Sequence, residues 1–280
     1  MRLIAIYLLG LKQEKIVEKV GGISMGIIKE MKTGNLEIKV YDTRQSMGEE
    51  AAREVSARIE ELQSRKSVIN MIFAAAPSQN EFLICLTKAV NIDWSRINAF
   101  HMDEYIDLDP EAPQGFGNFL KDSIFGKVPF KFVSYLNGNA SDIKAECSRY
   151  TELLKQNPVD IVCMGIGENG HIAFNDPHVA QFKDKELVKI VELDEKCRQQ
   201  QVNDGCFRTI DEVPTHAITL TIPALMSGDN IFCMVPASNK AEAIYNTIKG
   251  EITEKCPASV LKTHKSAILY TDIESARLIL

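Results

Sequence analysis

The sequence predicts an α/β fold with a mainly parallel sheet, and two kinds of segment carry that prediction. Residues 68–76 and 159–164 are apolar runs, typical of strands buried on both faces. Residues 48–63 place apolar side chains at helical spacing among good helix formers. Strands that alternate with helices over most of a chain are typical of parallel α/β sheets. The 280 residues suffice for one large domain or two small ones.

The remaining elements follow in order along the chain. Residues 36–41 alternate apolar and polar side chains, which predicts a strand. Further strands are expected at residues 97–102, 216–222, 230–235 and 267–270, and further helices at residues 80–90 and 240–249.

We expect one α/β domain at residues 36–280, preceded by an extension at residues 1–35. Residues 178–212 interrupt the alternation, because most of this stretch is polar and highly charged. A long segment of this kind in a compact domain is often a lid over a site. An ordinary pair of solvated helices is an equally good interpretation.

Composition and charge exclude several classes of protein. The chain has 32 Lys plus Arg against 38 Asp plus Glu, a net charge of −6, and lacks the basic stripe of a nucleic-acid binder. The apolar stretch at residues 3–11 is too short to span a bilayer, and charged residues follow it at once. Seven cysteines without a CxxC pair favour free thiols in a reducing compartment and give no zinc-site spacing. We therefore expect a cytoplasmic protein with no metal and no membrane or nucleic-acid partner.

Polar side chains follow two of the predicted strands at their carboxyl ends, where parallel sheets bind ligands. Ser78 comes after residues 68–76, where it could cap the next helix and help to hold an anion. On Ser78 alone, a plain helix cap is the better interpretation. Asp103 and Glu104 follow residues 97–102. Adjacent side chains of an extended backbone point in opposite directions, so one carboxylate can face a cleft as a base while the other turns away.

Residues 165–177 form a glycine-rich segment directly after the predicted strand at residues 159–164. The segment contains the pattern GxGxxG, which marks a dinucleotide site when a helix begins there. We reject that interpretation because residues 175–177, Asn-Asp-Pro, would stop a helix within two turns. A lone histidine is more often structural than catalytic. His171 is the better candidate because glycines present it at a strand end, and an imidazole titrates near neutral pH.

Four stretches of the chain together resemble the glucosamine-6-phosphate deaminase family. The two most informative are residues 100–105, FHMDEY, and residues 165–177, GIGENGHIAFNDP. Residues 135–147 and 238–241 are similar to segments that the family carries in the same order. The resemblance extends over residues 36–275. It implies a three-layer αβα, Rossmann-like fold, a sugar-phosphate substrate and a reaction without a cofactor.

The resemblance also implies roles for individual residues. Asp103 matches the base that moves a proton between C2 and C1 of the sugar. His171 matches the residue that assists ring opening, and Asp176 takes the place of a glutamate that orients it. Lys240 and Ser78 match residues that contact the phosphate.

Three positions depart from the family pattern. Asn169 stands where the family usually has an aspartate, and Gln201 stands where an arginine is expected. Residues 74–78 read Ala-Ala-Ala-Pro-Ser in place of a glycine-rich phosphate loop, so methyl groups and a proline reduce the backbone approach to an anion. Gly167 and Gly170 keep the pattern as substrate-binding positions. An amide cannot stabilise an imidazolium as a carboxylate does, so from the sequence we expect Asn169→Asp to raise turnover.

Three functions remain open at this point. The first is a deaminase and isomerase of an amino-sugar phosphate, most simply one that converts glucosamine 6-phosphate to fructose 6-phosphate and ammonia. The second is a 6-phosphogluconolactonase-like hydrolase, whose acid motif and post-histidine segment resemble this chain less well. The third is a sugar-phosphate-binding protein with weakened catalysis. The family resemblance alone suggests a homo-oligomer.

Overall fold

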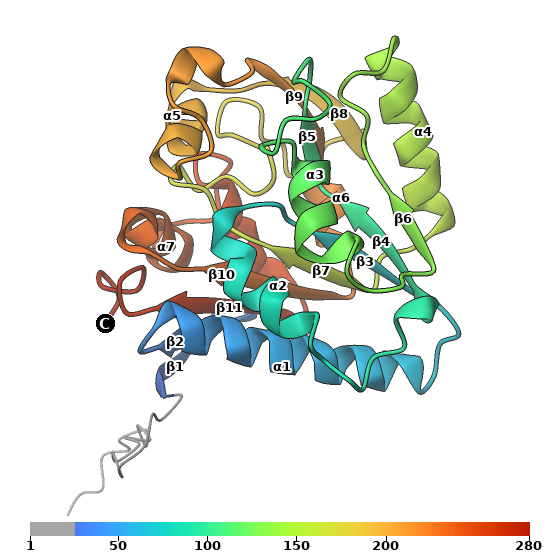
Figure 1. Ribbon diagram of the computed structural model, residues 1–280. Helices are drawn as coiled ribbons and strands as arrows, with labels where there is room; N and C mark the ends of the chain where they lie inside the picture. Colours follow the sequence, from blue (N-terminus) through green and yellow to red (C-terminus); the bar gives the residue numbers. More distant parts are fainter. Residues whose placement is uncertain (1–25) are drawn as a thin grey trace, which may run out of the picture.

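The computed structural model describes residues 26–280 and contains two sheets (Figure 1). The larger has eight strands in the order β1-β2-β11-β10-β7-β3-β4-β6. Its neighbouring strands are parallel except for the antiparallel pair β1 and β2. The strands of this sheet are β1 (Ile27–Thr33), β2 (Leu36–Tyr41), β3 (Ile69–Phe73), β4 (Ile97–His101), β6 (Phe132–Ser134), β7 (Ile161–Met164), β10 (Asn230–Val235) and β11 (Ala267–Asp272).

Helices cover both faces of this sheet, which confirms the predicted α/β class. The α-helices of residues 26–280 are α1 (Arg44–Gln63), α2 (Asn80–Leu86), α3 (Phe116–Leu120), α4 (Ile143–Gln156), α5 (Glu195–Asn203), α6 (Ile222–Met226) and α7 (Ala241–Lys249). Side chains alternate along a strand, so each central strand contributes to two cores. On β7, Ile161 and Cys163 pack with α1 and α2, whereas Val162 and Met164 pack with α4, α6 and α7.

The second sheet has three antiparallel strands in the order β5-β9-β8, namely β5 (Asp103–Tyr105), β9 (His216–Leu220) and β8 (Val188–Glu192). It lies beyond one end of the main sheet, above it in the view of Figure 1. The strand expected at residues 216–222 is therefore present, but it belongs to this smaller sheet. β5 begins two residues after β4 ends, so one continuous segment carries the chain from the main sheet into the smaller one.

Two segments differ from the sequence-based expectation. Residues 27–33, which we placed in an extension, form the edge strand β1 that pairs with β2. The pairing register between them is held by a turn in which Gly34 has φ +57°, a conformation that glycine adopts without strain. Residues 178–212 are not a helix pair, because they contain β8 and α5.

The apolar stretch at residues 3–11 lies outside the described residues. Among residues 26–280, no helix combines the length and the apolar character that crossing a bilayer requires.

Candidate active site

A cavity opens at the carboxyl ends of β3, β4, β7 and β10, as expected for a parallel sheet. The polar and charged side chains that line it are Arg44, Ser78, Asp103, His171, Gln200, Gln201, Asp204, Asn239 and Lys240. Six of the predicted site residues line this one cavity: Ser78, Asp103, Gly167, His171, Gln201 and Lys240. The other three, Asn169, Gly170 and Asp176, belong to the loop that presents His171. The structure thus brings together residues that lie more than 160 positions apart in the sequence.

The side chains of Asp103 and Glu104 point in opposite directions, as those of adjacent strand residues do. Asp103 lines the cavity, is only 6% exposed, and sits at the start of β5 opposite Thr219 of β9. Burial, with a smaller effect from the charge of Glu104, raises the pKa of Asp103 well above its ordinary value. A carboxyl group that resists ionisation in this way is a strong base once it has lost its proton.

Glu104 has a structural role. Its carboxylate accepts hydrogen bonds from the backbone N–H groups of Tyr105 at 2.9 Å, Phe116 at 3.0 Å and Gly117 at 2.8 Å. These bonds tie β5 to the start of α3. His101, in the same motif, is also structural: its Nε2 accepts the Leu136 N–H at 2.8 Å, and burial lowers its pKa to about 4. The imidazole of His101 is therefore neutral near pH 7.

His171 faces the cavity and has a buried carboxylate behind it. Its Nδ1 lies 2.9 Å from Oδ1 of Asp176, whose side chain has no solvent exposure. Burial by itself would raise the pKa of Asp176, but the nearby His171, the Asn169 amide and the Asp194 N–H together bring it below its ordinary value. Asp176 is therefore an ionised partner that reaches the ring although it is shorter than a glutamate. An ionised partner on Nδ1 leaves Nε2 for proton exchange in the cavity.

Asn169 does not act on the imidazole ring directly. Its Nδ2 donates to Oδ1 of Asp176 at 2.9 Å and to Oδ2 of Asp194 at 3.2 Å, and its Oδ1 accepts the backbone N–H of His171 at 3.0 Å. One amide therefore bridges two carboxylates. No sequence motif marks Asp194, because this residue reaches the loop only through the fold, as the N-cap of α5.

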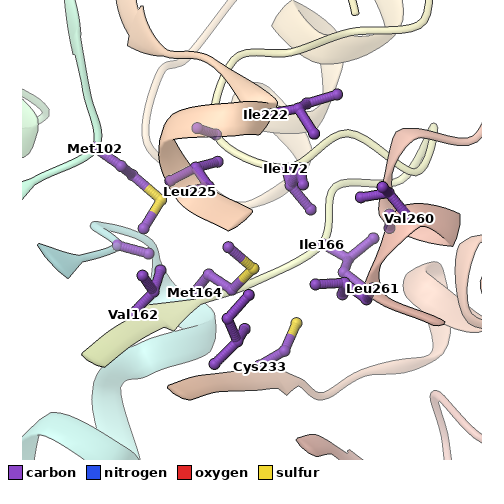
Figure 2. Packing of buried hydrophobic residues seen from close by; sticks show 14 of the residues in the cluster. Met102, Val162, Met164, Ile166, Ile172, Ile222, Leu225, Cys233, Val260 and Leu261 are labelled. Atoms are coloured by element: carbon purple, nitrogen blue, oxygen red, sulfur yellow. The ribbon is translucent and has the colours of Figure 1, made fainter. Parts of the chain in front are cut away.

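Two glycines allow the loop at residues 165–177 to fold closely around the His171 ring. An ideal Cβ on Gly167 would overlap the His171 ring, so the ring lies against bare backbone at that position. Gly170 has φ +85°, and a Cβ there would approach Sγ of Cys256 to 2.9 Å. Figure 2 shows Ile166 and Ile172 from the same loop pointing into the apolar core, beside Leu261 and Ile222 respectively. These apolar anchors hold the loop while the glycines accommodate the ring.

Cys197, in the first turns of α5, completes the surroundings of Asp176. Atoms of His171, Asp176 and Cys197 that can bind metals lie within 4.8 Å of one another. Burial, together with the charges of Asp176 and Asp194, raises the pKa of the Cys197 thiol well above its ordinary value. The thiol of Cys197 therefore keeps its proton beside the ionised Asp176.

The opposite wall of the cavity carries the predicted phosphate residues. Lys240 is 4% exposed; burial lowers its pKa, and the charges of Asp204 and Glu168 partly offset that effect. Gln201 is buried on α5 and lines the same space.

Ser78 also lines this wall, but it does not cap the following helix. It lies inside a 3-10 turn at Pro77–Gln79, and its Oγ accepts a hydrogen bond from Gln79 Nε2 at 3.0 Å. Pro77 is the first residue of this turn, so the turn begins two residues earlier than a cap at Ser78 would allow. Arg44, which no sequence motif marks, reaches the cavity from the first turn of α1.

A parallel α/β sheet with a buried acid and a histidine–aspartate pair at the ends of its strands defines an enzyme that moves protons on a small polar substrate. The chain belongs to the family of glucosamine-6-phosphate isomerases and 6-phosphogluconolactonases, whose sequence profile matches residues 42–270. This confirms the family resemblance drawn from the motifs.

Individual relatives support the same assignment. The chain is 40% identical over 187 residues to a glucosamine-6-phosphate deaminase of Bacillus cereus (strain B4264), covering 67% of this chain and 70% of that protein. It is 39% identical over the same length to the enzyme of that name from Bacillus cytotoxicus. A solved structure of a monomeric glucosamine-6-phosphate deaminase of the NagB superfamily superposes with a TM-score of 0.78 at 30% identity, covering 89% of this chain and all of the other. A 6-phosphogluconolactonase from Thermotoga maritima shares the fold at 16% identity, with a TM-score of 0.69 over 85% of this chain and 99% of the other.

Proposed function

We propose that the protein converts glucosamine 6-phosphate to fructose 6-phosphate and ammonia. The observation that carries the proposal is that Asp103 and His171 line one cavity together with the cations Lys240 and Arg44. That arrangement offers a base and an acid for the reacting carbons and positive charge for a phosphate. The named relatives with 39–40% identity are glucosamine-6-phosphate deaminases, which supports the same substrate.

The proposed reaction begins with ring opening. His171 exchanges a proton at Nε2 with the ring oxygen and the C1 hydroxyl, while Asp176 holds the other side of the imidazole. The product of this step is the open-chain aldehyde, with an amine on C2. Since Asp176 is an ionised partner, the positive charge that forms on the imidazole meets a negative charge 2.9 Å away.

Asp103 then isomerises the open chain. Its carboxylate removes the proton on C2 and returns it to C1, while the aldehyde oxygen takes up one proton and the C2 amine gives one up. C1 thereby becomes a CH2OH group and C2 an imine. Water adds to this imine and ammonia leaves, so one water is consumed for each ammonia released. Burial suits Asp103 to this step because a carboxylate with a raised pKa takes up a proton more readily.

A direct comparison of substrates tests the proposal. The purified protein is given glucosamine 6-phosphate or 6-phosphogluconolactone, and ammonia release and lactone hydrolysis are followed separately. The proposal expects turnover of the amino sugar with kcat/KM at least about 10³ times that for the lactone, within the range of ordinary enzymes. Lactone hydrolysis as the faster reaction would assign the alternative function, and binding without turnover of either compound would assign a sugar-phosphate-binding protein.

We also propose that the reaction takes place in the cytoplasm. All seven cysteines are free, and five of them are buried, which supports a reducing compartment such as the cytoplasm. The expected homo-oligomer remains a prediction, and the solved relative with 30% identity is described as monomeric.

A further inference from the structure

The cavity has two basic side chains although the segment at residues 178–212 provides none. Among the residues that line it, Arg44 and Lys240 are basic, whereas Gln201 of α5 is neutral. We infer that Arg44 is the second cation of the phosphate site and takes over the role of the arginine that the family pattern leads one to expect at Gln201. That the anion is a phosphate rests on the proposed function.

Local structure fixes Arg44 in this position. Thr43 caps α1 through a reciprocal pair of hydrogen bonds with Ser46, so Arg44 is the first residue of the helix. One turn later, Gly48 lets α1 approach α2 closely, since a Cβ at Gly48 would lie 2.9 Å from the Phe82 nitrogen. This close approach places the Arg44 side chain beside the loop that ends β3.

Two contacts hold the guanidinium of Arg44. Its Nη2 donates to the carbonyl oxygen of Pro77, and its Nε lies 2.8 Å from Oε2 of Glu81. Neither contact uses Nη1. The residue after Pro77 is Ser78, so Arg44 is bonded to the same loop that carries the predicted phosphate hydroxyl. A guanidinium fixed by a carboxylate on one edge is well suited to bind an oxyanion with its remaining donors.

The altered loop explains why a side-chain cation is needed here. A glycine-rich loop binds phosphate through backbone N–H groups, but this loop contains Ala75, Ala76 and Pro77, and proline has no N–H. Charge from Arg44 and Lys240 compensates for the missing N–H of Pro77 and for the methyl groups of the alanines. Arg44 is anchored on α1 and not on the segment at residues 178–212, so the position of this one cation is set by α1.

Binding measurements without turnover test the inference. Inorganic phosphate, glucosamine 6-phosphate and unphosphorylated glucosamine are titrated calorimetrically into the wild type, Arg44→Gln, Arg44→Lys and the control Arg53→Gln. Arg53 is on the same helix, and its side chain is 65% exposed. We expect Arg44→Gln to weaken binding of both phosphate compounds about 10- to 100-fold, the usual value of a hydrogen bond to a charged group, with glucosamine unaffected. Arg44→Lys should recover part of the loss, and Arg53→Gln should change nothing beyond about 2-fold.

The outcomes separate this inference from the proposed function. Loss of phosphate binding in Arg44→Gln would support the role of Arg44 even if the wild type released no ammonia. Unchanged phosphate affinity in a folded Arg44→Gln protein would overturn it, and so would a wild type that binds neither phosphate compound. If Arg44→Gln does not fold, a crystal structure of the wild type with phosphate decides: a phosphate oxygen within about 3.2 Å of the guanidinium supports the inference, and an anion held elsewhere overturns it.

Discussion

Replacing Asn169 by aspartate tests the part of the site for which the sequence and the structure lead to opposite expectations. From the family pattern, an aspartate at residue 169 is expected to support the catalytic histidine and raise turnover. The structure leads to the opposite expectation, a loss of turnover. Asn169 uses its Nδ2 to donate to two carboxylates, Asp176 at 2.9 Å and Asp194 at 3.2 Å, and an ionised aspartate has nothing to donate.

The cost follows from these distances. An aspartate oxygen in the place of Nδ2 would lie about 3 Å from two carboxylate oxygens, and each such pair repels by about 5 kcal/mol at an effective dielectric constant of about 20. The new group avoids this repulsion by turning away or by taking up a proton. Turning away still loses two hydrogen bonds to charged acceptors, about 1.5–3 kcal/mol each. We therefore expect Asn169→Asp to lower the free energy of unfolding by about 3–6 kcal/mol near pH 8.

The loss should depend on pH in a definite direction. Burial and the neighbouring carboxylates would raise the pKa of the new Asp side chain above its value in the unfolded chain. A carboxyl group with a raised folded-state pKa destabilises the protein as pH rises through that pKa, and the penalty shrinks as pH falls. Urea unfolding at pH 5 and pH 8 measures this difference. Asn169→Ala is the matched control, because it loses the same hydrogen bonds without adding a charge and should show no such dependence on pH.

Exchanging the two partners provides the rescue. In the double variant Asn169→Asp with Asp194→Asn, the new carboxylate at residue 169 faces one carboxylate, Asp176, and one amide in place of two carboxylates, and asparagine caps a helix as well as aspartate does. We expect the single variant Asn169→Asp to lose at least about 10-fold in kcat, because Asp176 and His171 shift when their support is lost. The double variant should recover part of both activity and stability. An Asn169→Asp protein that is as stable as the wild type and more active at every pH would refute this description of the site.

Further predictions concern the cavity itself. Asp103→Asn should keep the fold and lower kcat by about 10²–10⁴ in steady-state kinetics; because the folded-state pKa of Asp103 is raised, its stability relative to the wild type should increase as pH rises. The same raised pKa predicts that kcat/KM falls as pH drops through a value above the ordinary aspartate range, a limb that Asp103→Asn should lack. Gly167→Ala should displace the His171 ring and lower kcat by at least about 10², whereas an unchanged kcat would show that the ring has room. Lys240→Ala should chiefly raise KM for glucosamine 6-phosphate, by about 10- to 100-fold, and an equal loss with unphosphorylated glucosamine would remove Lys240 from the phosphate site.

Much of the fold could be predicted because its central strands and its longest helix follow from local patterns in the sequence. Apolar runs such as residues 159–164 and the helical spacing of residues 48–63 appear as β7 and α1 with boundaries moved by a few residues. β1 escaped prediction because an edge strand has one paired side and no strong apolar run. β9 was found, but its membership of the smaller sheet depends on pairing with β5 and β8, which lie far from it in sequence.

The site was predictable to the extent that its residues lie in recognisable motifs. Asp103 and His171 follow buried strands, and their positions at one cavity agree with the general rule for parallel sheets. Asp194 and Arg44 could not be found in this way, because each begins a helix whose packing brings it to the site from another part of the chain. The role of Asn169 depends on Asp194 and was therefore hidden as well.

The measurement that tests the account most directly follows ammonia and fructose 6-phosphate together in one reaction on glucosamine 6-phosphate. The wild type and Asp103→Asn are compared at equal concentrations of folded protein, with circular dichroism to confirm the fold. We expect the wild type to form the two products in equal amounts and Asp103→Asn to form both at a rate lower by about 10²–10⁴. No ammonia from the wild type, or near-equal rates for the two proteins, would contradict the claim that Asp103 is the base of an amino-sugar phosphate deaminase.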